Sequence, residues 1–324
     1  MSRKNRVVVI TGASSGIGRA TALHFAADGD CVVLASRRRD ALEEVAGQCE
    51  ELGVPALVVP TDVTDADAVD ALAAAAVARF GRIDVWVNAA GVSVFAEFVQ
   101  VPLDDFRRVI DVNLMGYVYG SRAALIHMGL QGRGVLVNVA SVLGEVPQPY
   151  TAAYGMSKAA VRALGVTLRS ELQLRGLKHV HVSTVLPATI DTPFFRHAAN
   201  YTGRKVLAMP PVYGPGKVAR TIVGLAKDPR DEVAVGAFSK ATVREHRRHP
   251  ASVEWELAAL TDKAQLSPHT PAPDTSGNLY APPDDVATIT GGWAGTQRMR
   301  LRTLLGWALL GGGAVAVWKA ARRR

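Results

Sequence analysis

The chain has 324 residues, of which 48% are hydrophobic, so it can bury a sizeable core and is not disordered throughout. A surplus of 37 basic over 29 acidic residues gives a net charge of +8, which by itself favours an anionic partner: nucleic acid, acidic lipid or a phosphorylated ligand. Two cysteines are too few for a disulfide framework. The first apolar run ends at Gly12, before a signal-peptide core could form, so we expect a cytoplasmic protein.

Short apolar runs alternate with longer amphipathic stretches from Val7 to about Val235, as in a parallel sheet with helical crossovers. The predicted strands are 6–10, 31–35, 56–59, 85–88, 135–140, 180–186 and 232–235. The predicted helices are 17–27, 40–52, 65–80, 103–128, 153–174 and 217–227. Because the strands are apolar without alternation, both faces of the sheet should be covered. The pattern predicts an α/β fold, a doubly wound parallel sheet of about seven strands.

The turn between the first predicted strand and helix is glycine-rich and reads Thr11-Gly12-Ala13-Ser14-Ser15-Gly16-Ile17-Gly18. Glycine at the first position permits a tight turn, and glycine at the last lets the helix pack closely on the strand. The main-chain amides between them are available to a phosphate at the helix N-terminus. The predicted phosphate-binding residues are Gly12, Ser14, Ser15, Gly16, Ile17 and Gly18.

This spacing, T-G-x-x-x-G-I-G, resembles the opening motif of the short-chain dehydrogenase/reductase family in its typical single-domain form, here with a C-terminal extension. The resemblance covers about residues 6–236 and implies a Rossmann-like fold with a nicotinamide cofactor. In the N-N-A-G motif, alanine replaces the second asparagine. The resemblance implies that Asp62 and Val63, after the third predicted strand, hold the adenine ring. It also implies cofactor contacts at the end of the fourth predicted strand, from Asn88, Ala89 and Gly91.

The end of the second predicted strand reads Ala35-Ser36-Arg37-Arg38-Arg39. It lacks the acidic residue with which NAD enzymes usually bind the ribose 2′-hydroxyl. A guanidinium suits a 2′-phosphate better than a carboxylate does. We therefore expect Arg37 and Arg38 to favour NADP(H) over NAD(H), the alternative being a solvated basic turn.

Tyr154 and Lys158 are four residues apart on a predicted helix and so share one face. A nearby ammonium lowers the pKa of a phenol, which would make Tyr154 a proton donor or acceptor. A tyrosine and a lysine at this spacing occur often by chance, but the family order of Asn113, Ser141, Tyr154 and Lys158 is complete. The resemblance implies that Ser141 holds the substrate oxygen and that Asn113 anchors a water that relays protons through Lys158. Alternatively, Ser141 merely ends a strand and Asn113 is a polar helix residue.

After the sixth predicted strand, residues 186–193 resemble the family segment that closes over the nicotinamide, with Ala188 in place of glycine. The residues implied to contact the cofactor there are Pro187, Ile190 and Thr192, in addition to Tyr154 and Lys158. The next stretch, 194–215, is rich in aromatic residues and predicts an apolar wall around the substrate. We therefore expect interconversion of a lipophilic ketone or aldehyde and its alcohol, with Tyr154 as acid or base.

The chain divides into a catalytic domain (1–240), a helical extension (241–261), a Pro/Gly-rich linker (262–296) and a basic, apolar tail (297–324). The tail has seven basic residues and no acid, so everything before it carries only +1. Its uncharged stretch, 303–318, is about 24 Å long as a helix and too short to span comfortably. We expect residues 298–324 to lie on an anionic membrane surface at the inner face of a membrane. Packing on the enzyme or a second subunit and a disordered tail are the alternatives.

Two other functions are compatible with these residues. One is a 3-oxoacyl thioester reductase; the other is a catalytically silent NADP(H)-binding regulatory protein at a membrane. The sequence shows neither metal-ligand spacing nor a nucleic-acid-binding module, so we expect no metal and no nucleic acid. The family commonly pairs through the helices near 103–128 and 153–174, which implies a homodimer or tetramer.

Overall fold

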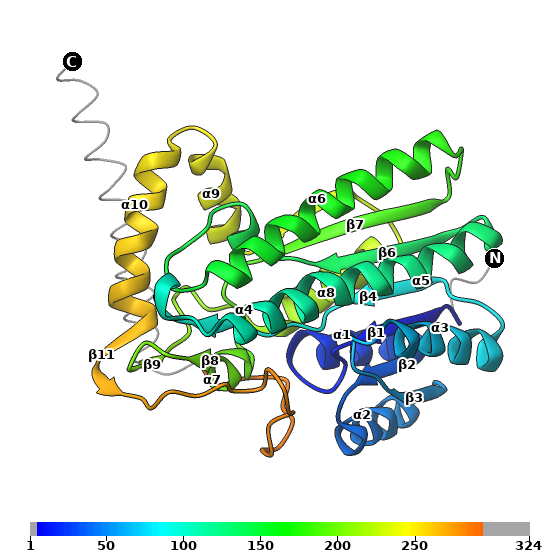
Figure 1. Cartoon of the computed structure of the whole chain (residues 1–324). Coiled ribbons are helices and arrows are strands. Elements are labelled where there is room, and N and C mark those ends of the chain that lie inside the picture. The colour runs from blue at the N-terminus through cyan, green and yellow to red at the C-terminus, as the bar shows by residue number, and fades with distance from the viewer. Residues whose placement is uncertain (1–4, 294–324) are drawn as a thin grey trace.

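The structure is a computed structural model and describes residues 5–293. Its centre is a parallel sheet with the strand order β10-β7-β6-β4-β1-β2-β3 (Figure 1). The strands are β1 (Val7–Thr11), β2 (Cys31–Ser36), β3 (Ala56–Pro60), β4 (Val85–Asn88), β6 (Gly134–Val139), β7 (Val180–Pro187) and β10 (Glu232–Val235). The order reverses between β1 and β4, so the prediction of a doubly wound parallel sheet is confirmed.

Helices cover both faces of this sheet (Figure 1). One face carries α1 (Gly16–Ala27), α2 (Arg39–Glu51) and α8 (Pro215–Leu225); the other carries α3 (Ala66–Phe80), α5 (Gly116–Gln131) and α6 (Ala152–Leu174). In β1, Val8 and Ile10 pack toward the first set, whereas Val7 and Val9 pack toward the second. Since both faces are buried, the central strands are mostly apolar on both faces.

Element ends follow local chemistry. Asp65 caps α3 by accepting hydrogen bonds from the amides of Asp67 (3.0 Å) and Ala68 (3.1 Å), and Gly81 ends that helix with φ of +79°. Outside the helix predicted over 103–128, the boundaries of the five other predicted helices and of the seven predicted strands differ from prediction by at most two residues.

The predicted helix over 103–128 is interrupted, and a single helix there is wrong. The chain forms α4 (Leu103–Ile110), a π-helical turn (Asp111–Met115) and then α5. Asn113 causes the departure, because its side chain bonds both main-chain groups of Val92 after β4. The π-helical turn and the contact of Asn113 with Val92 therefore occur together. Turns of this kind are frequent at functional sites.

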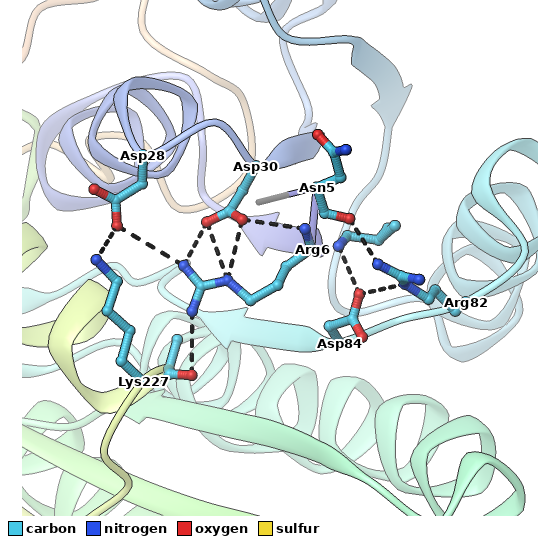
Figure 2. Close-up of polar contacts among 9 residues, drawn as sticks. Asn5, Arg6, Asp28, Asp30, Arg82, Asp84 and Lys227 are labelled. Atoms are coloured by element: carbon cyan, nitrogen blue, oxygen red, sulfur yellow. Dashed lines mark hydrogen bonds and ion pairs between the residues drawn. The ribbon is translucent and has the colours of Figure 1, made fainter. Parts of the chain in front are cut away.

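Charged residues form a group of hydrogen bonds and ion pairs at the edge of the sheet where the strands begin (Figure 2). The guanidinium of Arg6 bonds the buried carboxylate of Asp30, with Nη2 2.5 Å from Oδ2, and the carbonyl of Ala226 at 3.2 Å. Lys227 pairs with Asp28 in the same group. These contacts join the starts of β1 and β2 to the end of α8, far from the edge where the strands end.

The C-terminal third adds elements beyond the sheet. These are α9 (Ala237–His246), α10 (Pro250–Leu260), a second π-helical turn (Thr261–Gln265) and β11 (Leu266–Pro271). Short elements also occur within the domain: β5 (Val94–Phe95), α7 (Phe194–His197), β8 (Ala199–Asn200) and β9 (Arg204–Val206). β11 pairs with β9, and residues 272–293 then cross the domain without regular structure. The segment predicted as an extended linker, 262–296, thus begins with the π-helical turn and β11, and its remainder is packed on the domain as far as Trp293.

None of the helices within residues 5–293 is long and apolar enough to cross a membrane. The predicted tail, 297–324, with its apolar stretch 303–318, lies outside the described residues.

On α4, α5 and α6 some large apolar side chains are exposed, among them Leu103, Leu130 and Leu174. Association through these helices stays a prediction, which sedimentation of the purified protein would test.

Candidate active site

A deep cavity follows the carboxyl ends of the strands, at the place where the strand order reverses. Eighteen of the residues predicted from the sequence line it: Gly12, Ser14, Ser15, Gly16, Ile17, Gly18, Arg37, Arg38, Asp62, Val63, Ala89, Gly91, Ser141, Tyr154, Lys158, Pro187, Ile190 and Thr192. The structure therefore gathers residues from six strand ends around one space. Asn88 and Asn113 do not line it.

The glycine-rich turn leaves bare main chain facing this cavity. Gly12 and Gly16 have φ of +69° and +54°, values that residues with a Cβ rarely adopt. A Cβ on Gly16 would lie 3.2 Å from Cγ2 of Thr192, in the gap between the turn and the segment after β7. A Cβ on Gly18 would lie 2.1 Å from the carbonyl oxygen of Gly12. Side chains at these positions would be strained or crowded, and the main chain of the turn lines the cavity, where its amides could hold the diphosphate of a nicotinamide dinucleotide.

Asp62 follows β3 and is held as a carboxylate. Its Oδ1 accepts from the Thr64 amide (3.0 Å) and hydroxyl (2.8 Å), and its Oδ2 accepts from Arg108 at 2.8 Å. Burial pushes the pKa of Asp62 up, but these hydrogen bonds together bring it below its usual value. The acceptor at this end of the cavity is therefore fixed and charged.

Asn88 lies behind the cavity rather than in it. Its amide donates to Oδ1 of Asn138 at 2.9 Å, and its own Oδ1 accepts from the indole of Trp86 at 2.8 Å. The residue is buried and ties β4 to β6. The structure thus gives Asn88 a role in aligning two strands and shows no contact with the cavity.

The predicted reacting groups meet at the centre of the cavity. Lys158 Nζ donates to the carbonyl of Val139 (3.0 Å) and to the hydroxyl of Tyr117 (3.1 Å), and lies 5.7 Å from the centroid of the Tyr154 ring. Ser141 lies two residues after the end of β6, accepts from the amide of Leu143 at 3.1 Å, and is hydrogen-bonded to Tyr154. Strand β6 and helix α6 thus bring Ser141, Tyr154 and Lys158 together.

Burial dominates the titration of this pair. It raises the pKa of Tyr154 to about 12, and the hydrogen bond with Ser141 offsets only part of that rise. Burial also lowers the pKa of Lys158 to about 7, so its ammonium is itself disfavoured. The sequence analysis predicted a lowered pKa for Tyr154 from the charge of Lys158 alone. That prediction is wrong, because it left out the desolvation of the phenol. In this structure Tyr154 is a neutral phenol, the form that donates a proton.

Asn113 acts as a positioning residue. It is fully buried, and its side chain accepts from the amide of Val92 and donates to its carbonyl, each at 2.9 Å. A Cβ on Gly91 would lie 3.6 Å from Oδ1 of Asn113 and 3.9 Å from Nζ of Lys158, so Gly91 sits beside both. Asn113 therefore fixes the chain after β4 next to the lysine.

Tyr117 is a site residue that the sequence reasoning missed. It is buried, lines the cavity and accepts the hydrogen bond from Lys158 described above, with Nζ 4.4 Å from its ring centroid. Its own hydroxyl donates to the carbonyl of Val139 at 2.9 Å. Its position four residues after Asn113 could have indicated a shared helix face.

The far part of the cavity is mainly apolar. Its lining includes Leu143, Val146, Phe194, Phe195, Met209, Phe238 and Leu257, interrupted by Gln148, Thr242 and Gln265. Phe194 packs against Tyr154 with ring centroids 5.5 Å apart. Of the predicted aromatic wall, Tyr201 and Tyr213 point elsewhere, to Asp105 and to the amide of Phe238. The contribution of α9 and α10 was not predicted.

The described residues hold no group of three or more potential metal ligands. A doubly wound sheet with a glycine-rich phosphate turn, a buried serine and lysine and a half-buried tyrosine defines a dinucleotide-dependent oxidoreductase. The family model for short chain dehydrogenases matches residues 6–201, and the chain belongs to this family.

Known proteins agree with this assignment. An uncharacterised oxidoreductase of Bacillus subtilis, YxnA, is 38% identical over 242 residues, which are 74% of this chain and 67% of that one. The 3beta-hydroxysteroid dehydrogenase 1 of Eggerthella lenta is 36% identical over 69% of this chain and 88% of its own.

Two solved structures are similar. An alcohol dehydrogenase of Thermococcus sibiricus complexed with 5-hydroxy-NADP has a TM-score of 0.63 at 30% identity, covering 72% of this chain and 96% of that one. A short-chain dehydrogenase/reductase of Burkholderia phymatum in complex with NAD has a TM-score of 0.71 at 29% identity, covering 78% and 96%. Members of this fold family thus bind either dinucleotide.

Proposed function

We propose that this protein is an NADP(H)-dependent oxidoreductase that interconverts a lipophilic ketone or aldehyde and its alcohol. The observation that carries the proposal is one continuous cavity with three parts. A phosphate-binding turn lies in one part, Ser141, Tyr154 and Lys158 lie at the centre, and apolar side chains line the remainder. Such a cavity fits a dinucleotide and an apolar substrate that meet at a proton donor.

The bound nicotinamide supplies or accepts the hydride. For reduction, the hydroxyls of Ser141 and Tyr154 hold the carbonyl oxygen, and Tyr154 gives its proton to that oxygen as the alcohol forms. A phenol with a pKa of about 12 is fully protonated at neutral pH and ready to donate. Lys158 lies beside Tyr154 and is held there by the hydrogen bonds that its Nζ donates to the hydroxyl of Tyr117 and to the carbonyl of Val139. In the oxidative direction the same proton returns to Tyr154.

Cofactor preference should follow Arg37, because β2 ends without a carboxylate and the guanidinium lines the cavity. Arg37→Asp should weaken NADPH binding by roughly tenfold or more and favour NADH, because a carboxylate repels a 2′-phosphate and accepts from a 2′-hydroxyl. Dissociation constants for both nucleotides, measured by fluorescence titration, test this. Arg39→Asp is the matched control, since Arg39 is exposed and pairs with Glu43. An unchanged nucleotide ratio in Arg37→Asp would refute the assignment.

The apolar lining supports a lipophilic substrate, and the similarity to a hydroxysteroid dehydrogenase agrees with it. A 3-oxoacyl thioester is the alternative substrate class. A catalytically silent binding protein is disfavoured, because Ser141, Tyr154 and Lys158 are all present and all face the cavity. Oxidation of NADPH against ketones, aldehydes and 3-oxoacyl thioesters of graded size separates these possibilities.

Residues 298–324 are proposed as an interfacial membrane anchor on their sequence alone, which sets basic residues on both sides of an uncharged stretch. Removal of residues 295–324 should move the protein from the membrane fraction of lysed cells to the supernatant. Immunoblots of both fractions measure the partition. Equal partition of the full chain and the truncated chain would exclude the anchor.

A further inference from the structure

Residues 272–293, which we call the C-terminal strap, run from the end of β11 past β8 and α7 toward α1 and α2 (orange in Figure 1). The strap has no helix or strand of its own. Three of its residues, Asn278, Pro282 and Pro283, line the same cavity as the glycine-rich turn. The strap is therefore a wall of the cavity, with open space between it and the strand ends.

The first half of the strap is attached to the domain by main-chain contacts and one buried side chain. Thr275 and Asn200 bond each other's main chains at 2.8 and 3.0 Å. The amide of Asn278 donates to the carbonyl of His197 at 2.9 Å. Leu279 is fully buried in the apolar cluster that also contains Val63. These contacts fix the register of the strap against the domain.

The middle of the strap supplies main-chain carbonyls to arginines at the cavity. Arg37 donates to the carbonyls of residues 278 (2.7 Å), 279 (3.3 Å) and 280 (3.0 Å). Arg38 donates to those of residues 283 (2.9 Å) and 285 (2.7 Å). The contacts orient both guanidiniums. Arg37 donates through Nη1 and Nη2 and Arg38 through Nη1 alone, so each keeps further N–H groups for another acceptor.

The last part of the strap reaches the phosphate turn and the segment after β7. The amide of Gly16 donates to the carbonyl of Thr288 at 3.0 Å, so the strap occupies one main-chain donor of the turn. Oδ1 of Asp191 accepts from the amides of Gly291 (2.9 Å) and Trp293 (2.8 Å). The indole of Trp293 donates to the carbonyl of Thr192 at 3.0 Å. One strap thus spans from the arginines to Thr192.

We infer that the C-terminal strap is a part of the dinucleotide site that holds the bound cofactor in the cavity and sets the rate of its release. The inference rests on the proposed function, since it takes the cavity as the dinucleotide site. Two observations favour a covering wall over a plug: the space beneath the strap stays open, and Oδ1 of Asn278 is buried with no hydrogen-bond donor among the described residues. That oxygen is available to an amino group of a ligand.

Two glycines allow the strap to be loosened by adding single methyl groups. A Cβ on Gly277 would lie 2.3 Å from the carbonyl oxygen of His197, at the start of the attachment. A Cβ on Gly291 would lie 2.2 Å from the carbonyl oxygen of Thr192, near its end. Since both neighbours are main-chain atoms, the strap has to move away in Gly277→Ala and in Gly291→Ala. Val286→Ala is the control, because Val286 lies in the strap and is 77% exposed.

The experiment measures the dissociation rate of NADPH, by rapid mixing of the loaded full-length protein with excess NADP⁺, and the equilibrium dissociation constant by fluorescence titration. Circular dichroism establishes which variants are folded. Both glycine variants should release NADPH about tenfold faster or more and bind it correspondingly more weakly, whereas Val286→Ala should match the wild type. Because the variants act at opposite ends of the strap, agreement between them points to the strap as a whole.

Release at the wild-type rate from both folded glycine variants would overturn the inference while the proposed function stands. Tighter binding in both would also overturn it, because the strap would then compete with the nucleotide. If one variant fails to fold, the other decides the matter by the same criteria. A wild-type protein that binds neither NADPH nor NADH would contradict the proposed function, and the inference with it.

Discussion

Tyr154→Phe is expected to lower turnover of every carbonyl substrate by about 10²–10⁴-fold while NADPH still binds. The change removes only the hydroxyl, so the ring keeps its packing on Phe194, 5.5 Å away between centroids. What is lost is the proton that the substrate oxygen needs as hydride arrives. Steady-state kinetics on the best ketone, together with the dissociation constant of NADPH, separates loss of chemistry from loss of binding.

Tyr150→Phe is a matched control for this experiment. Tyr150 lies four residues earlier and donates its hydroxyl to Asp262 at 3.0 Å, outside the cavity lining. Its variant should keep the wild-type turnover. Full activity of Tyr154→Phe would mean that another group supplies the proton. A wild-type protein that binds NADPH but turns over no carbonyl would instead favour the silent, regulatory alternative.

Lys158→Met is expected to abolish turnover and yet make the folded protein more stable near neutral pH. A buried ammonium is costly, and burial lowers the pKa of Lys158 from 10.5 to about 7. Methionine fills a similar volume without a charge. The stabilisation would show that the chain keeps a destabilising lysine for the function of the site.

The free energy of unfolding of the wild type should rise with pH, because the pKa of Lys158 is lower in the folded chain than in the unfolded chain. Between pH 7 and 10.5 the unfolded chain binds a proton at Lys158 that the folded chain does not, so wild-type stability rises with pH. One pKa unit corresponds to about 1.4 kcal/mol, so the wild type should gain on the order of 2 kcal/mol relative to Lys158→Met between pH 7 and pH 9. Denaturant unfolding at several pH values below 10, where Tyr154 does not titrate, measures the difference.

Lys240→Met is the control for the loss of a lysine, since Lys240 is exposed on α9. Its stability should follow the wild-type curve across the same pH range. If the stabilities of Lys158→Met and the wild type also run parallel across this pH range, then Lys158 keeps an ordinary affinity for its proton in the folded state, and the lowered pKa of Lys158 is wrong.

The sequence by itself determined the sheet and its helices, because their signals are local and repeated. Apolar runs that must be buried on two faces marked the seven strands, and a cap such as Asp65 marked a helix start. The catalytic groups were also accessible, since Tyr154 and Lys158 share a helix face and the motif order fixes Ser141 at a strand end. Periodicity and short spacings are enough for such features.

Only the tertiary structure decided the features that depend on distant segments. The π-helical turn at Asn113 forms for a contact with Val92, 21 residues away in the chain. The partners of Arg37 lie up to 243 residues later, in a segment whose composition predicted a linker. The pKa of Tyr154 follows burial that no single helix supplies. In each case, the deciding energy comes from packing or desolvation among segments that local patterns do not relate.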